Sequence, residues 1–171
     1  MLAVVMVDVG QHGEHSLEYA HRLRSDLLKH LYVQHKVYCY TQNAASMYPR
    51  TRCKPHPVGV EWQNGSMFRA GAFTEERILY LSSDIIIRDD INCLAEYEGE
   101  FATSQKCHVM MWRNGVVPGV GVMADRLEDQ FPGMIVPYED GAQCDARIVT
   151  FDTPSHTLGG WVSEYWEKEA A

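Results

Sequence analysis

The segment that most constrains the fold is the apolar run RILYLSSDIII, residues 77–87, which has the composition of a buried β-strand. Three polar residues, Ser82, Ser83 and Asp84, interrupt it. A carboxylate is costly to bury without a partner, and polar residues that end a central strand of an open α/β sheet usually face the ligand crevice. Asp84 therefore marks the edge of a binding site or, as an equal alternative, accepts backbone hydrogen bonds in the loop after the strand.

The start of the chain has the pattern of a βαβ unit. Residues 2–9 are apolar and β-branched and lead into a loop that contains Gly10 and Gly13. From Ser16, a residue suited to cap a helix, apolar side chains recur at helical spacing as far as Leu31. A second strand is predicted over residues 36–41. The two strands are expected to pair in parallel through a right-handed crossover.

The remainder of the chain is richer in predicted strands. We expect strands over residues 107–112, 120–124, 135–136 and 147–151, and helices over residues 62–72, 125–131 and 161–170. Trp161, Tyr165 and Trp166 are predicted to pack the last helix onto the domain. Because no change in composition marks a boundary, residues 1–171 are predicted to form a single α/β domain with a mixed sheet flanked by helices.

Composition and charge argue against several classes of function. With 23 acidic and 15 basic residues the formal charge is −8, so general nucleic-acid binding is not expected. No apolar run is long enough to span a bilayer, and the short apolar start has no basic segment before it, so neither a transmembrane segment nor a signal peptide is expected. The five cysteines are widely spaced and include no C-x-x-C pair, which fits reduced thiols in a cytoplasmic protein.

Residues 77–94, RILYLSSDIIIRDDINCL, resemble the part of GT-A fold glycosyltransferases of the retaining, glycogenin-like type in which a hydrophobic strand delivers an acidic D-x-D motif. Residues 2–10 resemble the family's first strand and nucleotide loop, and residues 17–39 the helix and strand that follow. EWQNGSMF (61–68) resembles its "WWxKxxLF", VGVM (120–123) its "NSGVM", and residues 147–166 its closing "IVxFHGxPKP…WVxexW". The likeness is collinear over nearly the whole chain.

The resemblance implies a GT-A-like, Rossmann-type mixed sheet that transfers a sugar from a nucleoside-diphosphate sugar, in particular a UDP-sugar, to an acceptor that the sequence does not identify. It implies a divalent cation, Mn²⁺ or Mg²⁺, that bridges the two phosphates of the donor. The implied metal ligands are Asp84 of the motif, Asp152 at the position of the family's histidine, and His156, which lies four residues further on. The implied nucleotide contacts are Val9, Gly10, His15, Thr41, Ser82 and Ser83, and the sugar or acceptor contacts are Asn64, Gly119 and Gly121. No residue is assigned as catalytic.

Several positions depart from the family pattern. Ser82 stands where the first aspartate of D-x-D is expected, Asp152 replaces the histidine of "FHG", and Asn64 and Gly119 fall near a lysine and an asparagine of the family. Asp152 has the alternative role of capping the turn that follows it. Two functions therefore remain open: a glycosyltransferase with an altered metal motif, and a catalytically degenerate module for binding or assembly. A Rossmann-type oxidoreductase ranks below both, because Gly119 and Gly121 lack the strand-loop-helix frame of a dinucleotide fingerprint.

Overall fold

The computed structural model describes residues 1–8, 16–41, 51–55, 67–68, 71–116, 123–139, 145–152 and 155–169. The large, seven-stranded sheet contains β1 (Leu2–Asp8), β2 (His35–Thr41), β3 (Arg52–Pro55), β4 (Arg77–Leu81), β6 (Phe101–Thr103), β7 (Val109–Arg113) and β8 (Asp125–Arg126). The small, three-stranded sheet contains β5 (Ile85–Ile87), β9 (Ile135–Pro137) and β10 (Ile148–Thr150). The helices are α1 (Ser16–His30), α2 (Leu127–Gln130) and α3 (Trp161–Glu169), with 3₁₀ turns η4 (Asn92–Glu96) and η5 (Ser155–Thr157). No helix of these residues is long and apolar enough to cross a membrane.

The large sheet is mixed, as the sequence predicts. Its strand order is β3-β2-β1-β4-β7-β6-β8. β1 pairs in parallel with β2 and with β4, whereas β7 runs antiparallel to both β4 and β6. The chain proceeds from β1 to β2 and β3 on one side and places β4 on the other side. The order thus reverses between β1 and β4, and the carboxyl ends of strands at such a reversal usually border the ligand crevice.

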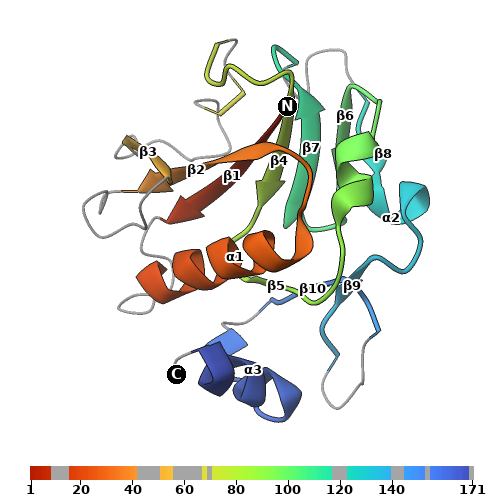
Figure 1. The fold of residues 1–171 in the computed structure, drawn as a ribbon. Coiled ribbons are helices and arrows are strands. Elements are labelled where there is room, and N and C mark those ends of the chain that lie inside the picture. Colours follow the sequence, from red (N-terminus) through yellow and green to blue (C-terminus); the bar gives the residue numbers. More distant parts are fainter. Residues whose placement is uncertain are drawn as a thin grey trace.

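The side chains of β1 alternate between two hydrophobic clusters, one on each face of the large sheet. Val4 and Met6 belong to the cluster that includes Leu23 and Leu27 of α1, and Val5 belongs to the opposite cluster. This alternation follows from the two-residue period of a strand. Figure 1 shows α1 lying across one face of the sheet. The sequence predicts that Leu28 is one of the apolar residues that recur at helical spacing between Ser16 and Leu31. Leu28 is instead 63% exposed, because one helical face is too narrow for both Leu27 and Leu28.

The apolar run 77–87 is not one strand, contrary to the sequence-based prediction. β4 ends at Leu81, β5 begins at Ile85, and the two strands belong to different sheets. Between them the backbone amide of Asp84 donates a hydrogen bond of 3.4 Å to Oγ of Ser82. Short polar side chains of this kind give the backbone a local alternative to the β-ladder, and the chain therefore changes sheet at the polar residues.

Two other predicted elements differ from the structure. Asp125 and Arg126, predicted to begin a helix, form β8, and α2 begins at Leu127. In the predicted helix 62–72, Met67 and Phe68 form a turn, although both are buried as expected. Of the predicted strand 120–124, residues 120–122 lie outside the described residues, and Met123 and Ala124 are not in a strand.

The C-terminal helix packs onto the domain through its aromatic side chains, which confirms that prediction. Trp161, Tyr165 and Trp166 pack against the cluster that contains Val149 and the other buried residues of the small sheet. The ring centroids of Trp166 and Tyr19 of α1 are 4.7 Å apart. Figure 1 shows α3 and the small sheet at the end of the large sheet toward which the arrows of β1 and β4 point.

Candidate functional site

Three segments that are distant in sequence meet at the carboxyl end of β4. The backbone amide of Ser82 donates a hydrogen bond of 2.7 Å to the carbonyl oxygen of His108, in the turn between β6 and β7. The backbone amide of Ser155, after β10, donates a hydrogen bond of 3.3 Å to Oδ1 of Asp84. The β4–β5 turn is therefore held on both sides at the edge of the sheet where ligands usually bind.

Asp84 is a buried acid at this edge. The residue is only 8% exposed. Burial raises the pKa of the Asp84 carboxyl from 3.8 to about 6, and the hydrogen bonds from Ser155 offset only part of this rise. The sequence allowed the alternative that Asp84 accepts backbone hydrogen bonds in the loop after the strand. Asp84 does accept one from a backbone amide, but the donor, Ser155, lies 71 residues away. A carboxyl with a pKa of about 6 exchanges its proton near neutral pH, as residues at functional sites often do.

Two helices brace Ser155, the partner of Asp84. Oγ of Ser155 donates a hydrogen bond of 3.2 Å to the hydroxyl of Tyr19 on α1 and accepts one of 3.3 Å from Nε1 of Trp166 on α3. The guanidinium carbon of Arg22 lies 3.7 Å from the centroid of the Trp166 ring. Because Ser155 is only 2% exposed, packing of both helices determines where the amide that bonds Asp84 points.

Asp152 lies in a more open environment than Asp84. Its side chain is 60% exposed and forms an ion pair with Nζ of Lys106, and its Oδ1 lies 4.0 Å from Nε2 of His108. The hydrogen bond from Lys106 lowers the pKa of the Asp152 carboxyl. Burial lowers the pKa of the His108 imidazole, and the nearby Asp152 opposes this effect. The two predicted metal-binding carboxylates therefore have different partners: a backbone amide for Asp84 and an ammonium for Asp152.

Three of the predicted nucleotide contacts are described, and all lie at or just beyond carboxyl ends of parallel strands. Thr41 ends β2 opposite Asp8 at the end of β1 and is 2% exposed. Ser82 and Ser83 follow β4, with Ser83 7% exposed. The predicted contacts outside the described residues are Val9, Gly10, His15, Asn64, Gly119 and Gly121. The sequence also predicts that Asp84 faces a cleft beside the loop of residues 10–15, and this loop lies outside the described residues. The backbone of His156 lies in η5, and its side chain is outside the description.

The described part of the chain contains no group of three His, Cys, Asp or Glu side chains arranged to hold a metal ion. The residues that sequence reasoning missed at this edge are Lys106, His108, Ser155 and Tyr19. Little in the sequence distinguishes these residues: Lys106 and His108 belong to an ordinary polar turn, and Tyr19 is a large side chain in a predicted helix.

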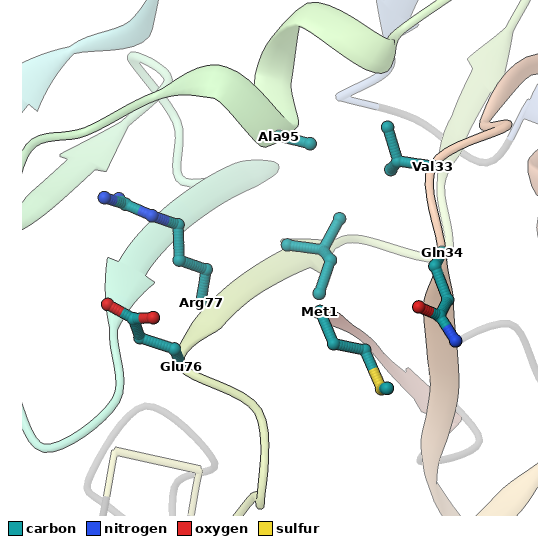
Figure 2. A pocket seen from close by; sticks show the side chains of 7 residues that line it. Met1, Val33, Gln34, Glu76, Arg77 and Ala95 are labelled. Carbon is teal, nitrogen blue, oxygen red and sulfur yellow. The ribbon is translucent and has the colours of Figure 1, made fainter.

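A cavity of about 350 Å³ lies at the opposite edge of the large sheet, where β1 and β4 begin. Figure 2 shows Met1 among residues from the α1–β2 connection, Val33 and Gln34, with Ala95 of η4 and Arg77 of β4 around the same space. Arg77 points its guanidinium at the carbonyl oxygens of Tyr97, Glu98 and Gly99. The backbone carbonyls thus already bind the guanidinium of Arg77. The cavity also lies at the opposite end of β1 and β4 from the candidate site.

The arrangement of strands is that of a GT-A-like fold, and solved structures of glycosyltransferases share it. The chain superposes on the glycosyltransferase GlyE of Streptococcus pneumoniae TIGR4 with a TM-score of 0.61 and 16% identity, covering 99% of this chain and 60% of GlyE. It superposes on the Q189E active-site mutant of LgtC with a TM-score of 0.62 and 10% identity, covering 99% of this chain and 95% of that one. No protein-family model and no curated protein sequence matches the chain.

A further structure is that of the galactosyltransferase LgtC in complex with donor and acceptor sugar analogs, with a TM-score of 0.56, 11% identity, and coverage of 98% of this chain and 94% of that one. At these identities the likeness concerns the fold. The chain spans about three-fifths of the length of GlyE.

Proposed function

We propose that the protein transfers a sugar from a nucleoside-diphosphate sugar to an acceptor, and that the donor binds at the carboxyl ends of β1, β2 and β4. The observation that supports this most directly is the position of Asp84. It is a buried carboxyl with a pKa of about 6, in the turn between β4 and β5 and beside the reversal of strand order. An open α/β sheet binds its ligands at such a reversal, and a buried acid with a perturbed pKa is a physical reason to expect chemistry there.

The proposed donor is a UDP-sugar, and its proposed nucleotide contacts are Val9, Gly10, His15, Thr41, Ser82 and Ser83. Asn64, Gly119 and Gly121 are proposed to contact the sugar or the acceptor. Two observations on other proteins support the donor class: GlyE is a glycosyltransferase, and LgtC is a galactosyltransferase whose structure includes donor and acceptor sugar analogs.

The implied metal site of Asp84, Asp152 and His156 fits the described residues poorly. Ser82 offers a neutral hydroxyl where a second carboxylate is expected, and the carboxylate of Asp152 is paired with the ammonium of Lys106. Hard divalent cations such as Mn²⁺ and Mg²⁺ prefer several oxygen ligands, usually with net negative charge. A cation bound here would also lie close to a positive side chain, which Coulomb repulsion disfavours.

The test has a binding arm and a turnover arm. A panel of nucleoside diphosphates and their sugars is screened by thermal shift with Mn²⁺ and with EDTA, since a ligand at about 100 times its dissociation constant adds roughly 2.7 kcal/mol to stability. Release of nucleoside diphosphate from each stabilising sugar donor is then measured for wild type and Asp84→Asn. Asp89→Asn is the matched control, because Asp89 is an exposed aspartate of the following turn. If the protein transfers sugar as proposed, wild type and Asp89→Asn release nucleoside diphosphate and Asp84→Asn does not.

The replacement of the first motif aspartate by Ser82 favours a second candidate, a catalytically degenerate module that binds a nucleotide or a sugar. The same experiment separates the two functions. Ligand-induced stabilisation without release of nucleoside diphosphate, in the presence of a range of sugar acceptors, supports the binding module. No stabilisation by any nucleoside diphosphate or its sugars overturns both.

A further inference from the structure

The turn between β6 and β7 presents a lysine at the edge of the sheet where the donor is proposed to bind. Ser104 holds this turn in place through three hydrogen bonds. Its amide donates one of 2.8 Å to the carbonyl of Val109, and its Oγ accepts one of 3.0 Å from the amide of Val109. Its carbonyl accepts the third, of 2.9 Å, from the amide of Cys107. Ser104 is 2% exposed. Oε1 of Glu128 accepts a further bond, 2.8 Å, from the amide of Gln105.

The backbone of the turn that carries Lys106 is also restrained at Cys107 and His108. Cys107 has a φ of 57°, which L-residues seldom adopt and which closes the turn tightly. The carbonyl of His108 accepts the bond of 2.7 Å from the amide of Ser82, so the turn is fastened directly to the end of β4. Lys106, two residues before this bond, therefore belongs to a turn that is hydrogen-bonded to the end of β4.

The present partner of Lys106 is held only weakly. The side chains of Lys106 and Asp152 are 53% and 60% exposed. Ion pairs in such exposed positions contribute little net stability, because solvent screens the charges and both side chains lose rotamer freedom. An anion with more charge than a single carboxylate is therefore able to replace Asp152 at the ammonium.

We propose that Lys106 binds the diphosphate group of the donor in place of a divalent cation, and that Asp152 occupies the ammonium only while the donor is absent. The inference rests on the proposed function and names the residue that neutralises the phosphates. A diphosphate brings several negative charges and many acceptor oxygens, and a lysine ammonium brings three donors to meet them. Lys106 also supplies positive charge from a turn that is bonded to Ser82, the residue that replaces a metal ligand of the family.

The proposal assigns Asp152 an effect opposite to that of a metal ligand. If Asp152 competes with the donor for Lys106, its neutralisation frees the ammonium and binding becomes equal or tighter. If Asp152 instead holds a cation that bridges the phosphates, its neutralisation weakens binding. Weaker binding in Asp152→Asn therefore indicates a metal ligand, and unchanged or tighter binding indicates a competitor for Lys106, even before Lys106 is altered.

The experiment is calorimetric titration of UDP, and in parallel of GDP, into wild type, Lys106→Gln, Lys106→Arg and Asp152→Asn, each with EDTA and with Mn²⁺. Lys29→Gln is the matched control, because Lys29 is an exposed lysine in the last turn of α1. We expect wild type to bind in EDTA. Loss of a charge-assisted contact should weaken binding by roughly ten- to a hundred-fold in Lys106→Gln, with partial recovery in Lys106→Arg and no change in Lys29→Gln.

The outcomes distinguish failure of this inference from failure of the proposed function. One outcome overturns the role of Lys106 but leaves the nucleotide site in place. In that outcome wild type binds nucleotide only with Mn²⁺, Asp152→Asn loses this binding, and Lys106→Gln keeps it. If binding in EDTA is equal in wild type and Lys106→Gln, the role of Lys106 is likewise overturned. If neither nucleotide binds in either buffer and the wider panel gives no stabilisation, the proposed function itself is overturned.

Discussion

The backbone amide of Ser155 donates a hydrogen bond of 3.3 Å to Oδ1 of Asp84, and this bond joins the β4–β5 turn to the segment after β10. Ser155 is in turn bonded to Tyr19 of α1 and Trp166 of α3. The acidic residue of the candidate site thus depends for its orientation on the packing of both helices. A substitution in α3 is therefore expected to alter the position of Asp84 through Ser155.

The first prediction concerns Asp84 and pH. Its folded-state pKa of about 6 exceeds the ordinary 3.8, so the folded protein binds more protons than the unfolded chain between these values. Stability therefore falls as pH rises from about 4 to about 6, and the loss persists above that range. At about 1.4 kcal/mol for each pKa unit, the loss amounts to at most about 3 kcal/mol.

Asp84→Asn removes this penalty, because the amide keeps the shape of the side chain without its charge. The variant should be more stable than wild type by about 1–3 kcal/mol at pH 7, with the difference shrinking toward zero near pH 4. Urea unfolding of both proteins from pH 4 to 8 measures it. A difference that does not vary with pH would contradict a carboxylate destabilised by burial.

The second prediction concerns Trp166, which supports Ser155. Trp166→Ala removes the ring that contacts Tyr19 and Arg22 and should cost about 2–4 kcal/mol, at the lower part of the range for large aromatic truncations because the residue is partly exposed. Trp166→Phe retains most of the ring area but loses the N–H donor to Ser155, and should cost about 1 kcal/mol. Chemical denaturation measures both. Equal losses in the two variants would show that packing of the ring is unimportant.

The third prediction concerns the buried carboxylate of Glu75, at the opposite edge of the sheet. Burial acts to raise its pKa, but hydrogen bonds from Lys36, Thr74 and Tyr38 outweigh this effect and hold the pKa at about 2. Since the folded-state pKa is below the ordinary 4.5, these bonds contribute stability above about pH 4.5 that is lost as pH falls toward 2.

Lys36→Gln leaves Glu75 buried without its ammonium partner, and the side chain of Glu75 is 1% exposed. We expect a loss of about 2–4 kcal/mol at pH 7, with the gap to wild type narrowing below pH 5 as Glu75 of the variant takes up a proton. Lys29→Gln, at an exposed site, should change stability by less than about 0.5 kcal/mol. Thermal unfolding at pH 4 and pH 7 supplies the comparison, and a gap that widens in acid would refute the explanation.

The fourth prediction concerns Gly99, which lies against the ring of Tyr97. A Cβ added at Gly99 would stand 2.0 Å from Oη of Tyr97, and that hydroxyl donates a hydrogen bond of 2.6 Å to Asp125 at the start of β8. Gly99→Ala should therefore displace the ring and cost about 1–3 kcal/mol. Gly159→Ala is the control, because nothing lies within 4 Å of the added atom there. Similar melting temperatures for the two variants would contradict the predicted clash.

The sequence predicted those parts of the fold that depend on local pattern. The parallel β1–β2 pair, α1, the short strands β9 and β10, and the packing of α3 all follow from periodic apolar residues over short windows. Periodicity did not distinguish one long strand from two short ones in residues 77–87, because β4 and β5 are both buried and apolar. The polar residues between them marked the change of sheet.

By itself, the sequence determined a mixed α/β fold and singled out Asp84, since an acid within an apolar run is conspicuous in any fold. Only the tertiary structure decided the partners of the site. Lys106 and Asp152 are 46 residues apart, and Asp84 and Ser155 are 71 apart. Residues so distant meet only when β6, β7 and β10 have taken their places around the end of β4. Local propensities carry no information about such pairings, because the pairings arise from the packing of whole elements rather than from neighbours along the chain.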